Sequence, residues 1–71
     1  MQYLVIFEKS NDGSIWAQVP DLPGCFSSAD TIEEAKKSVI EAIELHIEGL
    51  REEGLEIPAP FTQAELVTVE D

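Results

Sequence analysis

The sequence predicts a small α+β domain in which a mostly antiparallel sheet carries one helix on one face, in the order β-β-β-α-β. Two β-branched and aromatic runs near the N-terminus are separated by turn residues, which is typical of a hairpin. A long amphipathic stretch follows, with helix-start and helix-stop residues at its ends. A last apolar run, ELVTV, occupies residues 65–69. The 71 residues suffice for one small domain, which we expect over residues 1–71.

The first two runs predict a β-hairpin. Residues 3–7 read YLVIF and residues 15–19 read IWAQV, and both compositions favour strands. Between them, the turn NDGS at residues 11–14 contains Asp-Gly, a dipeptide typical of tight hairpin turns. Pro20 ends the second strand because proline has no N–H to donate to a ladder.

The next stretch, VPDLPGCF at residues 19–26, is predicted to be a structural corner. Pro23-Gly24 is a turn dipeptide, in which the glycine supplies backbone freedom. Asp21 is expected to accept hydrogen bonds from nearby backbone amides. Residues 25–29 then form a short third strand.

A capping motif marks the start of the helix. Thr31-Ile-Glu-Glu34 matches the capping box T-x-x-E, and Asp30 is a competing N-cap one residue earlier. We expect the helix to run from Ile32 to about Glu53, with Gly54 just beyond its end.

The predicted helix has two chemically different faces. The face expected to lie on the sheet is apolar and contains Ile32, Ala35, Val39, Ile43, His46, Ile47 and Leu50. The opposite face is rich in acids and contains Glu34, Lys37, Glu41, Glu44, Glu48 and Glu52. Leu45 stands among these acids, beside small residues, and is therefore a candidate contact for another chain.

The second face of the sheet is expected to be apolar as well. Leu4 and Ile6 point away from the core side of the first strand, and Trp16 does the same in the second. A sheet with one wet face normally alternates apolar and polar residues, so this pattern predicts an exposed patch typical of a partner site. The alternative is that the connector at residues 55–63, with Phe61, folds beneath that face.

Candidate catalytic groups are few. Cys25 as a nucleophile would need a base, and the only histidine, His46, lies in the apolar face of the helix. We therefore expect Cys25 to be a small apolar filler. One cysteine and one histidine cannot complete a closed zinc site, and no set of carboxylates suggests two-metal hydrolysis. The sequence thus predicts no catalytic residue, no metal and no cofactor.

The charge of the chain indicates its class of partner. Fifteen acids against four bases give a net charge of −11. Direct nucleic-acid binding is disfavoured because it depends on Lys and Arg contacts to phosphate, whereas a basic protein is a natural complement. No long apolar run suggests a membrane span, and a cytoplasmic location is expected. The small core and open sheet edges favour a homo-oligomer, either a dimer or a tetramer.

Several strings match a known family. They are Phe7-Glu8-Lys9, NDG at residues 11–13, Trp16 with Val19, PDLPGC at residues 20–25, DTIEEA at residues 30–35, EAIELH at residues 41–46 and IPAP at residues 57–60. With them, the chain resembles the HicB-like antitoxin family. The resemblance implies a partial RNase H-like fold that is not itself a nuclease. It also implies a partner, because HicB antitoxins silence HicA toxins, which are small basic ribonucleases that cut messenger RNA.

The sequence therefore favours a non-catalytic antitoxin-type protein that masks a basic HicA-type toxin. HicB antitoxins commonly carry a C-terminal DNA-binding module, and we expect none in this chain. Two alternatives stay open: a stand-alone regulatory or ligand-binding domain without a toxin, and a small RNase H-like enzyme. The candidate partner-binding residues are Trp16, Asp21, Leu22, Glu41, Glu44, Leu45 and Glu48.

Overall fold

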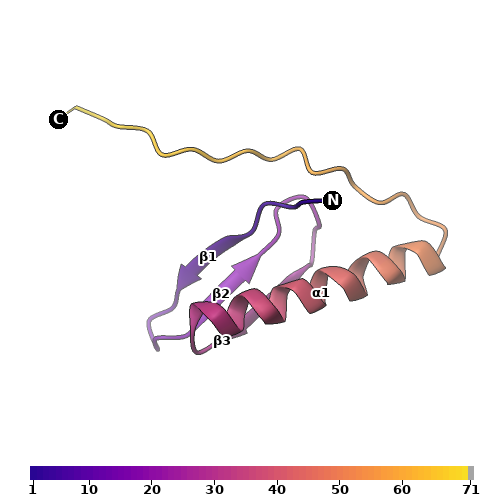
Figure 1. Cartoon of the computed structure of the whole chain (residues 1–71), viewed down its shortest axis with the longest axis horizontal. Coiled ribbons are helices and arrows are strands. Elements are labelled where there is room, and N and C mark those ends of the chain that lie inside the picture. Colours follow the sequence, from indigo (N-terminus) through magenta and orange to yellow (C-terminus); the bar gives the residue numbers. More distant parts are fainter. Residues whose placement is uncertain (71) are drawn as a thin grey trace.

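An antiparallel sheet of three strands carries one helix on one face (Figure 1). The computed structural model describes residues 1–70. Its elements are β1 (Ile6–Lys9), β2 (Ile15–Gln18), β3 (Phe26–Ala29) and α1 (Ile32–Glu52). β2 lies in the middle and pairs with both β1 and β3. The predicted α+β class, with three strands followed by one helix, is confirmed.

The corner at residues 19–26 is held by its own backbone. The amide of Val19 donates to the carbonyl of Cys25 at 3.1 Å, and the amide of Cys25 donates to the carbonyl of Leu22 at 3.0 Å. Gly24 has a φ of 84°, in the left-handed region that glycine adopts without strain. The prediction of a structural corner is therefore confirmed, and its compact shape sends the chain directly from β2 into β3.

Both ends of α1 are capped as the sequence predicts. The Thr31 hydroxyl accepts a hydrogen bond from the amide of Glu34 at 3.2 Å. At the other end, Gly54 has a φ of 69° and its amide donates to the carbonyl of Arg51, while the amide of Leu55 donates to the carbonyl of Leu50. This pair of bonds is a Schellman motif, which ends the helix and turns the chain back along the molecule.

The core lies between α1 and the inner face of the sheet. Val39 of the helix packs into a cluster of buried residues that also contains Ala17, Val19, Leu22 and Cys25. The helix lies mainly over β3 and β2, so the inner side of β1 is less well covered. Partly buried side chains complete the core, and they are Tyr3, Val5, Phe7, Ala42 and Ile43.

The first strand is shorter than predicted. The expectation was a strand over residues 3–7, whereas β1 covers Ile6–Lys9. The ladder with β2 stops at the pair Ile6–Gln18, because the chain enters the corner at Val19 and Pro20 has no amide hydrogen. Residues 3–5 therefore have no strand opposite them.

The predicted fourth strand at residues 65–69 is absent from the sheet of this chain, and that expectation was wrong for this structure. After α1, the connector (residues 55–63) runs back past the N-terminus (Figure 1). It is held there by the Tyr3 hydroxyl, which donates to the Pro58 carbonyl at 2.5 Å, and by Asp21, which accepts two hydrogen bonds from Thr62. The tail (residues 64–70) then leaves the body and meets no strand edge.

Replacing Thr31 by alanine is expected to lower the free energy of unfolding by about 1 kcal/mol, because the amide of Glu34 loses its acceptor. Urea unfolding followed by circular dichroism measures this difference. The Thr31→Ser variant keeps a hydroxyl and is the matched control. Equal losses in the two variants would contradict the capping role.

Ser27 lies on the helix-facing side of β3, and within the described residues its buried hydroxyl has no hydrogen-bond partner. Ser27→Ala is expected to raise the free energy of unfolding by about 1 kcal/mol, because an unsatisfied polar group is removed from the core. The same urea titration tests this. The neighbouring Ser28 is exposed on the other face, so Ser28→Ala should leave stability nearly unchanged.

Candidate partner-binding surface

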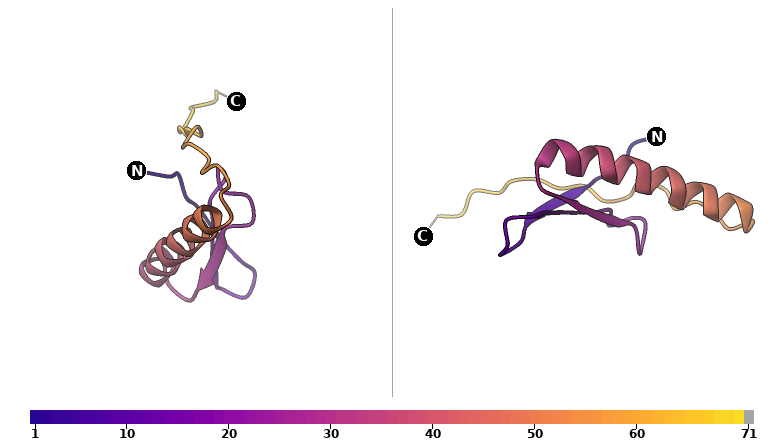
Figure 2. Two further views of the ribbon diagram at one scale, coloured as in Figure 1. Left: turned by 90° about the vertical axis from the view of Figure 1, so that its right-hand side faces the viewer. Right: turned by 90° about the horizontal axis from the view of Figure 1, so that it is seen from below.

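The face of the sheet turned away from α1 is largely uncovered. The strand register aligns Ile6, Gln18 and Phe26 in one row and Glu8, Trp16 and Ser28 in the next. We call the surface formed by Ile6, Glu8, Trp16, Gln18 and Phe26 the aromatic face. Figure 2 shows that the helix lies on the opposite side of the sheet, so no helix or strand within residues 1–70 shields the aromatic face.

Two stacked rings form the centre of the aromatic face. The ring centroids of Trp16 and Phe26 are 5.8 Å apart and their planes meet at 30°. Trp16 pairs with Ser28, so Phe26 lies diagonally across the strands from it. Even in the stack, Trp16 is 45% exposed and Phe26 is 56% exposed. Fully burying an aromatic side chain of this kind contributes about 1.5–3 kcal/mol, so much of that energy is still available to a partner.

A hollow of about 460 Å³ lies between the stacked rings and the corner. Pro20 and Pro23 line it from the corner, and Glu8 contributes a carboxylate. Apolar walls with one carboxylate suit an arginine side chain, because its stem packs on a ring while its guanidinium group pairs with the acid. The chemistry of the hollow therefore fits a basic residue of another protein.

The connector does not cover the aromatic face. The sequence left open that Phe61 folds beneath it, but Phe61 is 79% exposed and Trp16 and Phe26 remain accessible. The hydrogen bonds of Tyr3 and Asp21 hold the connector beside the N-terminal residues instead. The second face of the sheet thus stays open in the part of the chain that the structure describes.

The acidic candidates form a second, separate surface on α1. Glu41, Leu45 and Glu48 are exposed, and Leu45 is 68% accessible. Glu44 is also exposed, but it borders a groove beside the N-terminal residues. The helix that carries them lies on the face of the sheet opposite the aromatic face (Figure 2). The structure therefore divides the predicted partner-binding residues between two surfaces.

Two of the candidates have structural roles. Leu22 is 0% exposed and belongs to the core cluster, so its proposed role as a partner contact was wrong. Asp21 was expected to bond to nearby amides, but its acceptor atoms hold the connector. Its carboxylate accepts from the Thr62 hydroxyl at 2.6 Å and from the Thr62 amide at 2.9 Å. These two bonds stabilise the charged form and lower the pKa of Asp21 below its ordinary value.

Cys25 has the environment of a packing residue. It is 5% exposed and contacts the core cluster, and burial raises the pKa of its thiol. A raised pKa keeps the thiol protonated, which is the opposite of what a nucleophilic cysteine needs. Within residues 1–70, no three His, Cys, Asp or Glu side chains converge closely enough to hold a metal ion.

Sequence reasoning placed Ile6 and Trp16 on the second face of the sheet but missed Phe26. Phe26 was visible as an apolar residue, but only the strand register places it beside Trp16. A usable signal was present: Phe26 is the second residue of the third predicted strand, and alternation from Cys25, the expected apolar filler, points it outward.

Comparison with known proteins identifies the class of this fold. The chain matches, over residues 3–71, a family described as the HicB-like antitoxin of bacterial toxin–antitoxin systems. The match spans the sheet, the helix, the connector and the tail. The chain therefore belongs to the HicB-like antitoxin family. Within the described residues, α1 is not apolar enough to be a membrane-crossing helix.

Three relatives illustrate the similarity. An uncharacterized 14.9 kDa protein of Haemophilus phage HP1 is 50% identical over 58 residues, which are 82% of this chain and 43% of the phage protein. The UPF0150 protein ssr1765 of Synechocystis is 48% identical over 56 residues, or 79% of this chain and 71% of that protein. The UPF0150 protein Ta0767 of Thermoplasma acidophilum is 42% identical over 69 residues, or 97% of each chain. The chain thus spans less than half of the phage relative and nearly all of the archaeal one.

Acidification is expected to release the connector from Asp21. Because the folded-state pKa of Asp21 is lowered, its tether is fully present above the ordinary value of 3.8 and is lost as the pH falls through the lower folded value. The amide resonance of Thr62 in an NMR pH titration should report that lower midpoint.

The control for this titration is another hydrogen-bonded aspartate. Asp12 accepts from Ser14 in the hairpin turn and has no contact with the connector. Asp21→Ala should shift the Thr62 amide to its released position at neutral pH, whereas Asp12→Ala should not. An unchanged Thr62 resonance in Asp21→Ala would contradict the tether.

Proposed function

We propose that this chain is a non-catalytic antitoxin that masks a small basic HicA-type toxin. Membership of the HicB-like antitoxin family supports a toxin partner in general. The observation that favours a particular mode of binding is the uncovered aromatic face with its stacked Trp16 and Phe26. A toxin that targets messenger RNA would be met in the cytoplasm.

The charge of the chain suits a basic ribonuclease. A net charge of −11 on 71 residues attracts a positively charged protein over a distance of about one Debye length, or roughly 8 Å at physiological salt. The toxin surface that binds RNA phosphates must itself be basic, so an acidic chain that covers it competes with the RNA. Masking of this kind requires no chemistry from the antitoxin.

The aromatic face supplies the short-range contacts that charge alone lacks. Exposed surface salt bridges contribute little, whereas desolvated aromatic residues and paired arginines dominate the energy of most interfaces. Trp16 and Phe26 offer the aromatic anchor, and Glu8 offers a carboxylate to a basic side chain in the hollow beside them. We therefore place the toxin on the aromatic face and assign the acids of α1 a role in long-range attraction.

Replacing Trp16 by alanine is expected to weaken binding of a HicA-type toxin by about 30-fold, since a central aromatic anchor contributes roughly 2 kcal/mol. Binding is measured by isothermal titration calorimetry with a catalytically inactive toxin, and protection by growth of cells that co-express the active toxin. Trp16 is 45% exposed, so the fold should survive, and a circular dichroism melt checks this.

Leu45→Ala is the matched control because Leu45 is an exposed apolar residue of the other candidate surface. Its affinity for the toxin should stay within about twofold of the parent chain. A loss of affinity in Leu45→Ala with none in Trp16→Ala would place the toxin on the helix and contradict the proposed surface. Failure of the parent chain to bind any HicA-type toxin, or cleavage of RNA by the purified chain, would favour the regulatory-domain or enzyme alternatives.

A further inference from the structure

The tail is an apolar β-strand sequence without a sheet. Leu66, Val67 and Val69 are 104%, 78% and 79% exposed, although the tail is already extended. Their composition is typical of a strand, and such residues are rarely left fully in water in succession. The tail therefore has the conformation of a strand but lacks the neighbouring strand that would bury it.

The sheet has a vacant position for such a strand. β1 is an edge strand, because the strand order is β1-β2-β3 and nothing pairs with its outer edge within residues 1–70. Edge strands present free N–H and C=O groups that can accept another strand. The residues before β1, at positions 3–5, are also without a ladder partner. Together they offer a continuous edge.

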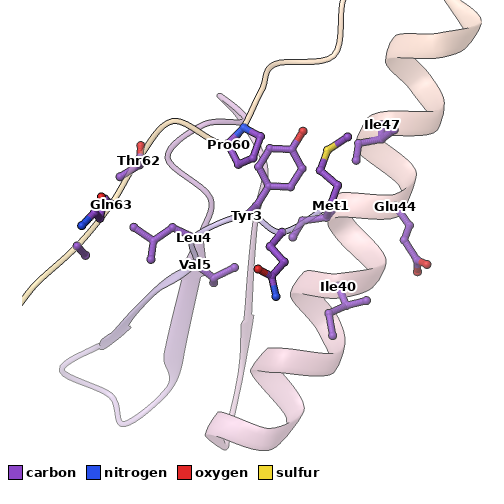
Figure 3. Close-up of a pocket in the computed structure, with 13 residues that line it drawn as sticks. Met1, Tyr3, Leu4, Val5, Ile40, Glu44, Ile47, Pro60, Thr62 and Gln63 are labelled. Atoms are coloured by element: carbon purple, nitrogen blue, oxygen red, sulfur yellow. The ribbon is translucent and has the colours of Figure 1, made fainter.

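An apolar groove runs beside this edge. It has a volume of about 1000 Å³ and lies between the N-terminal residues and α1. Figure 3 shows Ile40 and Ile47 of the helix on one side of the N-terminal segment, and Thr62 and Gln63 on the other. Ile40 is 55% exposed there. A strand beside β1 would direct alternate side chains into this groove and cover the isoleucines.

The tail does not take this position in its own chain. Thr62 is fixed to Asp21 by hydrogen bonds of 2.6 and 2.9 Å, and Pro58 is fixed to Tyr3. From these anchors the tail diverges from β1 in the views of Figure 1 and Figure 2. The strand sequence is thus presented outward, toward a second molecule.

We propose that two copies of the chain exchange their tails, so that residues 65–69 of each copy pair with β1 of the other. The exchange gives each body a four-stranded sheet in which the fourth strand comes from its partner. By strand alternation, Val67 and Val69 enter the groove beside Ile40 and Ile47, while Leu66 extends the aromatic face next to Ile6. One symmetric contact then buries Val67 and Val69 of each tail in the groove and packs Leu66 beside Ile6.

A second copy fits this role better than another occupant. Every copy carries both the strand and the vacant edge, so a two-fold arrangement satisfies both at once. The eight residues 63–70 span about 26 Å when extended, which is enough to run the length of β1. The inference does not depend on a toxin, because the tail, the edge of β1 and the groove all belong to this chain.

Sedimentation velocity of the full chain tests the exchange, with Val67→Glu as the disrupting variant. The full chain is expected to be a dimer, and Val67→Glu should raise the dimer dissociation constant by roughly tenfold or more, because it places a charge in the apolar groove. Leu55→Glu is the matched control, since Leu55 is 53% exposed and lies outside the tail. It should leave the dissociation constant unchanged. A chain that remains monomeric at all concentrations overturns the proposal.

NMR on a mixture of isotope-labelled and unlabelled chains identifies the strand itself. Nuclear Overhauser effects between Val67 or Val69 methyl groups of one copy and β1 of the other are expected. Such effects found only within one chain would show that the tail closes on its own body, which overturns the exchange. The dependence on salt concentration distinguishes this dimer from the toxin complex. A higher salt concentration should strengthen the association of two acidic chains and weaken the binding of a basic toxin.

Discussion

The packing of α1 across β2 and β3, with Val39 against Ala17 and Leu22, is the contact on which the rest of the structure depends. One helix of 21 residues can cover one face of a three-stranded sheet and no more. Because the helix lies toward β3, the inner side of β1 is also left partly open. The aromatic face and the groove beside β1 are therefore both open for the same reason: a single helix covers only part of the sheet. A domain of this size gains from a partner at both places.

Local signals predicted most of the body of the fold. The Asp-Gly turn, the corner with its prolines, the Thr31 cap and Gly54 act through contacts a few residues apart, so their positions follow from the sequence alone. The helix boundary fell within one residue of expectation. Non-local contacts were harder to predict. No local pattern shows that β1 loses its partner at the corner, or that Asp21 bonds to Thr62, which is 41 residues away.

The candidate surface was predicted in character but only partly in membership. The first predicted strand has apolar residues at both alternating sets of positions. This pattern correctly indicated an uncovered second face, with Trp16 on it. Phe26 can be placed on this surface only from the register of β2 and β3, and that register depends on the number of residues in the corner. Leu22 was misassigned because an apolar residue between prolines and beside an aspartate resembles an exposed loop position. It turns inward, because the hydrogen bonds of the corner fold that loop over the core.

The corner also joins two surfaces that are distant in function. Pro20 and Pro23 line the hollow on the aromatic face, while Asp21 between them holds Thr62 of the connector. The same short loop thus forms one wall of the hollow and anchors the connector. Because Pro20 and Pro23 flank Asp21 in the sequence, one substitution that reshapes this loop would alter both the hollow and the attachment of residue 62.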